Sequence, residues 1–170
     1  MQFLAKINGQ SLPMWTTYVM VPEEISEHFI KTLQTRRVKM ILENTIYQVA
    51  LHPDGNGCFA LQLSKGTMKK HQLEIGSSVS ITLEEDHSKY GIYCCEEFEE
   101  LLKIDFEGSE YFHQLTPGKQ RSLIHIISKL KSEQKRIEKG LVVLDHLKNQ
   151  NGKLDYEILR EDFKNANKRF

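Results

Sequence analysis

Residues 60–83 read ALQLSKGTMKKHQLEIGSSVSITL, and this stretch decides how the N-terminal half of the chain folds. Apolar residues alternate with polar ones at both ends of the stretch, which is typical of strands with one buried face. Between these ends, residues 65–73 predict a short helix with Met68 and Leu73 on its inner side, stopping near Gly76. The stretch therefore predicts a strand, a short helix, a turn and a second strand.

The same order of elements occurs once more, in residues 18–42. Here YVMVP precedes the predicted helix and RVKMIL follows it. Pro22 stands at a first helical position, where its missing N–H costs nothing. Ile25, Phe29 and Leu33 follow at the spacing of one helix face. The N-terminal half therefore contains two copies of one unit.

Two such units predict how the sheet closes. An exposed strand edge invites aggregation, so two units in one chain are expected to close on each other. The sequence therefore predicts an α+β fold with an N-terminal pseudo-twofold β-barrel that carries two short helices, followed by an α-helical C-terminal tail. The alternative is a generic α+β sheet with a chance repeat. Further strands are expected at 3–7, 15–21 and 46–51.

Charge is unevenly distributed along the 170 residues, although Lys and Arg number 23 and Asp and Glu also number 23. Residues 1–95 are balanced, residues 96–118 hold one basic and seven acidic residues, and residues 119–170 hold 13 basic and seven acidic ones. A break this sharp predicts a barrel domain at 1–95, an acidic connector with short helices at 96–118 and a basic helical tail at 119–170.

The expected tail contains clear helix starts. Thr116 is a plausible N-cap with proline after it, Ser132 caps a second helix, and Asp155 caps a third. Apolar residues then recur at helical spacing in each segment. We expect three helices that pack on the barrel or on each other.

Several motifs resemble known families. Residues 61–79 resemble the strand–helix–Gly–strand half of AbrB/MazE-like double-split barrels, in which two chains usually contribute one half each. Further motifs are Arg36-Arg37-Val38, His52-Pro-Asp-Gly-Asn-Gly57, Lys65 with Lys69 and Lys70, and Phe112-x-x-Leu115-Thr-Pro-Gly118, followed by Arg121, Lys129-x-Lys131 and Lys135-Arg136-Ile137. With these motifs, almost the full chain resembles an uncharacterised bacterial family, in which a barrel of unknown function precedes a helical segment named bacteriocin-protection, YdeI/OmpD-associated. That resemblance implies a double-split barrel here and a link to bacteriocin or envelope stress, without a defined chemistry.

Clusters of basic residues are the candidate anion- or partner-binding sites. One pair enters a predicted strand, a second group lies at the equivalent place of the other unit, and a third lies in the tail. A basic cluster can hold phosphate or carboxylate groups, and on nucleic acid it gives salt-dependent affinity. The alternative is ordinary solubilising charge. The candidates are Arg36, Arg37, Lys65, Lys69, Lys70, Lys129, Lys131, Lys135 and Arg136.

The sequence contains no motif that we connect with catalysis, a cofactor or a metal. Asp54-Gly-Asn56-Gly57 is similar to the start of a calcium loop, but Phe59 stands where such a loop needs glycine. Cys94 and Cys95 are expected to be free thiols, because adjacent cysteines rarely bind one ion. A Cys–His nucleophilic pair stays open, since its members meet in space rather than in sequence.

These observations favour a non-enzymatic binding or stress-accessory protein with no cofactor. The odd number of cysteines favours a reducing compartment, so we expect a cytoplasmic chain. We also expect no membrane span, an unknown protein partner and a monomeric or weakly dimeric state. The alternative is a nucleic-acid-binding regulator, which whole-chain neutrality disfavours. An enzyme of unrecognised type is a third hypothesis.

Overall fold

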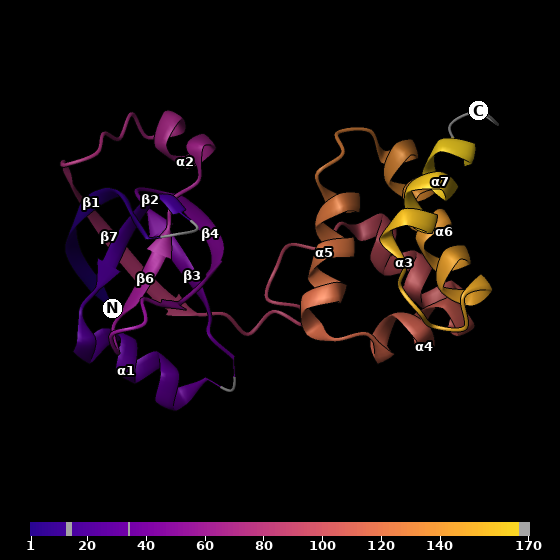
Figure 1. Ribbon diagram of the computed structural model, residues 1–170, viewed down its shortest axis with the longest axis horizontal. Helices are drawn as coiled ribbons and strands as arrows, with labels where there is room; N and C mark the ends of the chain where they lie inside the picture. The colour runs from indigo at the N-terminus through magenta and orange to yellow at the C-terminus, as the bar shows by residue number, and fades with distance from the viewer. Residues whose placement is uncertain (13–14, 34, 167–170) are drawn as a thin grey trace. The chain divides into compact units, whose positions relative to one another are not determined.

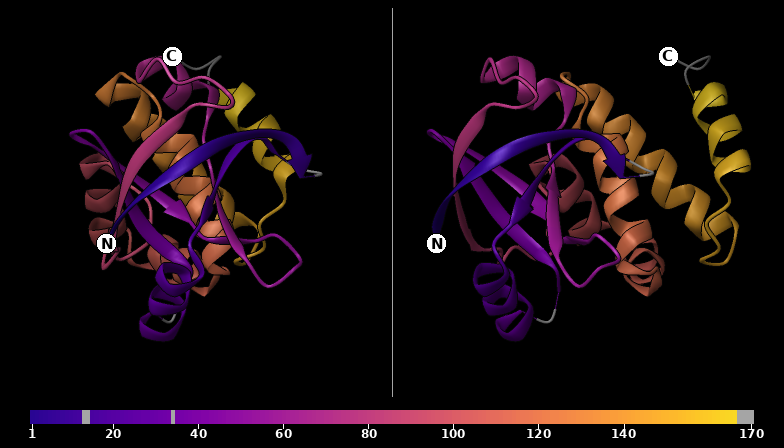
Figure 2. Two further views of the ribbon diagram at one scale, coloured as in Figure 1. Left: turned by 90° about the vertical axis from the view of Figure 1, so that its left-hand side faces the viewer. Right: turned by 60° about the vertical axis from the view of Figure 1, so that its left-hand side comes forward.

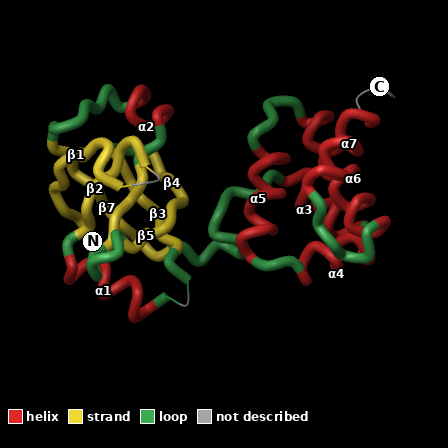
Figure 3. The backbone as a smooth tube through the Cα atoms, in the orientation of Figure 1, coloured by secondary structure: helices red, strands yellow, loops and turns green. Residues whose placement is uncertain are grey.

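The structure is a computed structural model that describes residues 1–12, 15–33 and 35–166. The chain divides into two compact units, Met1–His87 and Ser88–Phe170, called unit 1 and unit 2 below (Figure 1). Unit 1 is built on strands and unit 2 on helices (Figure 3). Within the described residues, no helix is long and apolar enough to cross a membrane.

Unit 1 contains one antiparallel sheet whose strands follow the order β4-β3-β7-β1-β2-β6-β5. The bounds are β1 Gln2–Leu12, β2 Trp15–Val21, β3 Arg37–Leu42, β4 Thr45–Ala50, β5 His52–Pro53, β6 Phe59–Gln62 and β7 Ser78–Glu85. The predicted α+β class is confirmed, and so are two strand–helix–strand copies, β2-α1-β3 and β6-α2-β7.

The sheet is strongly curled. Figure 2 shows β1 as a long, bent ribbon, and its two halves pair with different strands, Gln2 to Lys6 with β7 and Ile7 to Leu12 with β2. At the two ends of the strand order, β4 pairs with β3 and β5 with β6. These end strands are consecutive in the chain with only Leu51 between them, so the sheet bends back upon itself.

The core of unit 1 fills the inside of this curl. In β3 alternate residues point inward, as the burial of Val38, Met40 and Leu42 shows. The Met1 amino group donates a hydrogen bond to the Leu83 carbonyl at 2.7 Å, which ties the start of the unit to its last strand. Burial of alternate apolar residues is therefore the main stabilising contribution.

Two helices cover opposite ends of the curled sheet, α1 (Glu23–Thr32) and α2 (Lys65–Lys70) (Figure 1). The predicted helix at 65–73 ends earlier, at Lys70, because Gln72 adopts a positive φ of 50°. The Leu73 N–H closes this end by donating to the Met68 carbonyl at 2.9 Å.

Unit 2 consists of helices around a second core. Phe98, Phe112, Leu123 and Val143 are fully buried in it. The predicted N-caps at Thr116, Ser132 and Asp155 are confirmed, since each side-chain oxygen accepts a backbone N–H of the first helical turn. The bounds are α3 Glu96–Ile104, α4 Phe106–Gln114, α5 Pro117–Ser128, α6 Glu133–Asn149 and α7 Tyr156–Ala166.

The division differs from the predicted domains at 1–95, 96–118 and 119–170. Unit 1 ends at His87, and α3 and α4 share one core with α5 and α6. Burial of Phe98 and Phe112 outweighs the charge difference, because charges on outward faces can pair across helices. Two such pairs join the acidic segment to the basic one, Glu97 with Arg136 and Asp105 with Lys148. The charge break therefore lies within one unit.

Candidate functional site

The first predicted basic pair lies at the start of β3. Arg36 is exposed in the preceding bend, and the Arg37 guanidinium donates to the Gln48 carbonyl of β4 at 3.1 Å. Burial lowers the pKa of the His52 imidazole, and the charges of Arg36 and Arg37 lower that pKa further. Both arginines therefore lie where β3, β4 and β5 meet, and their charges act on His52.

The second predicted cluster borders a pocket next to α2, here called the α2 pocket. Lys65 and Lys69 line it, whereas Lys70 of the same helix does not. Its volume of about 890 Å³ is in the range of small-molecule sites. The lining residues are Gly9, Thr17, Lys65, Met68, Lys69, Gln72, Leu73, Glu74 and Ile75.

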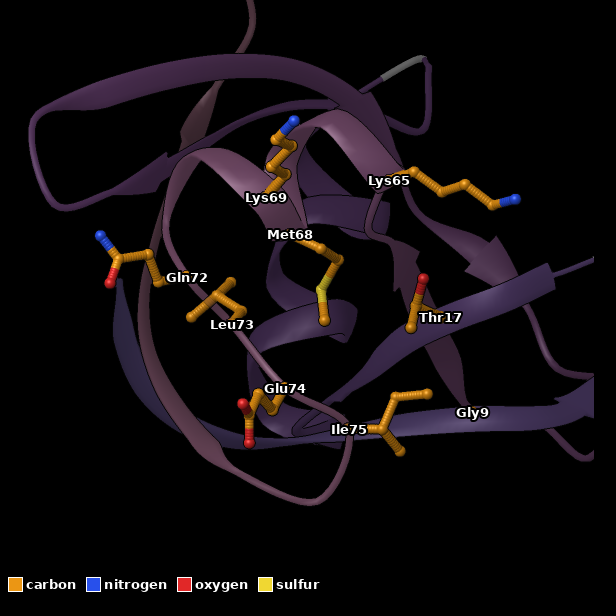
Figure 4. A pocket seen from close by; sticks show the side chains of 9 residues that line it. All are labelled: Gly9, Thr17, Lys65, Met68, Lys69, Gln72, Leu73, Glu74 and Ile75. Carbon is orange, nitrogen blue, oxygen red and sulfur yellow. The ribbon is translucent and has the colours of Figure 1, made fainter.

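The floor of the α2 pocket is apolar. Met68 extends from α2 towards Thr17 and Ile75, and Leu73 completes the floor on the other side (Figure 4). Ile75 is 61% exposed, which is unusual for a large aliphatic side chain. Such a floor favours a ligand that carries apolar surface.

The segment around Ile75 is fixed by backbone hydrogen bonds to β1. The Gly76 N–H donates to the Ile7 carbonyl at 2.8 Å, and the Ile7 N–H donates to the Ser77 carbonyl at 2.9 Å. Gly9 allows the close approach, because a Cβ there would lie 2.8 Å from Cδ1 of Ile75. These backbone hydrogen bonds therefore hold this part of the floor against β1.

Charged groups border the pocket on two sides. The side chains of Lys65 and Lys69 extend from α2, and Glu74 lies on the opposite side (Figure 4). Neither lysine amine forms an ion pair or hydrogen bond with any residue that the structure describes. Two lysines against one glutamate give this rim a net positive charge.

The two repeated helices differ in how they cover the sheet. Helix α1 has ten residues and buries Ile25 and Phe29, whereas α2 has six residues and buries only Thr67. A helix of six residues presents too little apolar surface to fill the sheet end beneath it. The pocket is the volume that α2 leaves open.

Two side-chain hydrogen bonds attach the end of α2 to the β3–β4 hairpin. The His71 Nδ1 lies 3.1 Å from the Glu43 carboxylate, and its Nε2 lies 2.8 Å from the Tyr47 hydroxyl. Because a carboxylate can only accept, the Nδ1–H of His71 donates to Glu43, and Nε2 forms the second hydrogen bond with the Tyr47 hydroxyl. The wall of the pocket is thereby linked to β4.

The third predicted cluster is divided in unit 2. Lys129, Lys131 and Lys135 are exposed around the α5–α6 connection. Arg136, in contrast, forms a two-pronged ion pair with Glu97 and donates to the Leu130 carbonyl at 2.9 Å. The Arg136 hydrogen bonds lower the pKa of the Glu97 carboxyl to about 2. Arg136 therefore joins α6 to α3, and each of its three guanidinium nitrogens donates a hydrogen bond.

The candidate nucleophiles of unit 2 are not among the residues that line the α2 pocket. Burial raises the pKa of the Cys94 thiol to about 12, and Cys95 is buried. His113 and His146 each use both ring nitrogens in hydrogen bonds within unit 2. No group of three metal-ligating side chains occurs among the residues that the structure describes.

The sequence did not predict that Thr17, Glu74 and Ile75 would join Lys65 and Lys69. One signal was available, because the two apolar residues Leu73 and Ile75 directly precede the turn at Gly76. The contribution of β1 and β2 depends on the curl of the sheet, which no local pattern encodes.

Together, the curled sheet and the half-covered end of unit 1 define a small α+β domain with a ligand-sized pocket. Residues 3–83 match a protein family described as domain of unknown function (DUF1905), and this range covers nearly all of unit 1. No curated protein and no solved structure matches the chain.

Proposed function

We propose that this chain is a non-enzymatic binding protein and that the α2 pocket of unit 1 holds its ligand. One observation carries the proposal, a ligand-sized pocket with an apolar floor and two lysines that have no partner among the described residues. Apolar walls with a few well-placed polar groups are typical of small-molecule sites.

The chemistry of the remaining candidates supports binding over catalysis. A thiol with a pKa of about 12, such as Cys94, is almost entirely protonated near neutral pH and is a poor nucleophile. His71, His113 and His146 are held by bonds within their own units. The α2 pocket itself is lined by lysine, glutamate and neutral side chains, with no histidine or cysteine.

The test is a screen of chemically mixed small molecules followed by methyl NMR. A ligand in the pocket shifts the methyl signals of Met68 and Ile75 in a saturable way and leaves buried Met40 unchanged. Ile75→Ser weakens such binding, while Ile46→Ser, at a similarly exposed site outside the pocket, leaves it within twofold. A broad library that moves neither Met68 nor Ile75 would refute the proposal.

We further propose that unit 1 is a pseudo-twofold double-split barrel within one chain. The support is that corresponding strands pair with each other, β2 with β6 and β3 with β7. In addition, β1 joins β2 to β7, and the consecutive strands β4 and β5 join β3 to β6. An experimental structure in which β4 and β5 separate, leaving the sheet open, would contradict this architecture.

The family resemblance supports a role in protection against bacteriocins or envelope stress, exerted from the cytoplasm with a protein partner. Expression in a bacterium exposed to a bacteriocin tests this role. Survival should rise with the intact chain and fall back with Ile75→Ser, and equal survival with and without the chain would oppose the proposal.

A nucleic-acid-binding regulator is the second candidate, and the exposed Lys129, Lys131 and Lys135 favour it. Three lysines within seven residues can neutralise phosphates and give salt-dependent affinity. An electrophoretic shift that is absent even at low salt would exclude this function.

A further inference from the structure

We infer that the α2 pocket binds a small amphipathic monoanion, an unbranched apolar body that carries one carboxylate. The inference rests on the proposed function and names the class of ligand. It follows from the apolar floor, the charge of the rim and the position of that charge on one side of the pocket.

The floor selects for an apolar body. Met68, Leu73 and Ile75 present methyl and methylene groups to the pocket, and Thr17 offers little polarity because its hydroxyl donates to the Leu63 carbonyl at 3.0 Å. A sugar or nucleotide would leave its hydroxyl groups unpaired over such a floor. Each methylene that enters the pocket is expected to tighten binding about threefold to fourfold.

The rim selects for one negative charge. Lys65 and Lys69 contribute two positive charges on the α2 side, and Glu74 contributes one negative charge opposite (Figure 4). A dianion would exceed the net charge of the rim, and a cation would meet two like charges. Both lysines carry their amine on a flexible stem, so either amine can turn towards a bound carboxylate while its stem covers the apolar body.

The polarity of the pocket also sets the direction of the ligand. Repulsion by Glu74 drives the carboxylate to the α2 side, and the apolar body then lies along Met68 and Ile75. A ligand in this pose shifts the methyl signals of both residues. Buried Met40 stays unchanged, because it belongs to the core of unit 1.

The test titrates the full chain with decanoate, hexanoate, decanol and decyltrimethylammonium, and follows the methyl signals of Met68 and Ile75. The ionic compounds are kept below their micellar concentrations and decanol below its solubility. We expect decanoate to bind at least tenfold more tightly than the cation and than hexanoate. The Lys65→Met/Lys69→Met variant should weaken decanoate binding about tenfold, in line with two partly exposed ion pairs. Lys70→Met removes the same charge from the same helix outside the pocket and should change affinity less than twofold.

The outcomes separate the class of ligand from the proposed function. Decanol or the cation binding as tightly as decanoate, or Lys70→Met acting as strongly as the double variant, overturns the anion class but leaves a binding pocket. Hexanoate binding as tightly as decanoate overturns the apolar body. If no compound of either charge moves Met68 or Ile75, both the ligand class and the proposed pocket fail.

Discussion

Replacing Tyr47 by Phe tests whether the hydrogen bond to His71 holds α2 over the pocket. The change removes one hydroxyl that lies 2.8 Å from Nε2 of His71 and keeps the ring. The His71 side chain is only 4% exposed, so its Nε2 loses its partner with little access to water. An intramolecular hydrogen bond contributes about 0.5–1.5 kcal/mol, and an unpaired polar atom raises the cost, which gives about 1–2 kcal/mol here.

Native-state hydrogen exchange measures this effect locally, which is necessary because two units need not unfold together. The His71 amide, bonded to the Thr67 carbonyl at 3.1 Å, should exchange about 5–30 times faster in Tyr47→Phe. A double-mutant cycle with His71→Leu should give a coupling energy of about 1 kcal/mol.

The matched control is Tyr90→Phe, which removes a hydroxyl that lies 3.0 Å from Nε2 of His113 in unit 2. It should accelerate exchange in unit 2 and leave the amides of α2 unchanged. Unchanged exchange at His71 in Tyr47→Phe, or a coupling energy near zero, would refute the role assigned to this bond.

Three more predictions concern the cores and ionisable groups. Phe29→Ala should lower the free energy of unfolding of unit 1 by about 3–5 kcal/mol in urea, because the Phe29 side chain is only 2% exposed and its removal leaves a cavity. A decrease below about 1 kcal/mol would contradict the packing of α1. The pKa of Glu97 is lowered in the folded protein, so its contribution to stability is complete above its ordinary value of about 4.3 and is lost as the pH falls towards about 2. Glu97→Gln should therefore flatten the acid limb of thermal unfolding, and a profile identical to that of the parent chain would argue against the ion pair with Arg136. Iodoacetamide at pH 8 should label exposed Cys58 well before Cys94, because burial raises the pKa of the Cys94 thiol to about 12. Peptide mass spectrometry of the alkylated chain measures both rates, and equal rates would contradict the burial of Cys94.

The local patterns of the sequence predicted elements well because their causes are local. Alternating apolar residues predicted β3, and the caps at Thr116 and Ser132 predicted the starts of α5 and α6. The end of the helix after Lys65 was harder to predict, since it depends on the positive φ of Gln72, a residue type that tolerates helices well.

Charge patterning was the weaker guide, both to domains and to sites. The acidic residues of 96–118 suggested a connector, but Phe98 and Phe112 place this segment in the core of unit 2. Arg136 resembled its lysine neighbours in sequence, and its pairing with Glu97 depends on how α3 and α6 pack. The α2 pocket combines residues of β1, β2 and α2, so only the three-dimensional structure brings its lining together.

The hydrogen bond between the Met1 amino group and the Leu83 carbonyl places the first residue of unit 1 beside its last strand, four residues before the unit ends at His87. A domain whose ends meet can be inserted into a surface loop of a host protein without pulling either partner apart. Residues 1–87 are therefore suited to be spliced, through short flexible joints, into a fluorescent reporter. In such a fusion, filling of the cavity beneath α2 would be converted into an optical signal inside living cells.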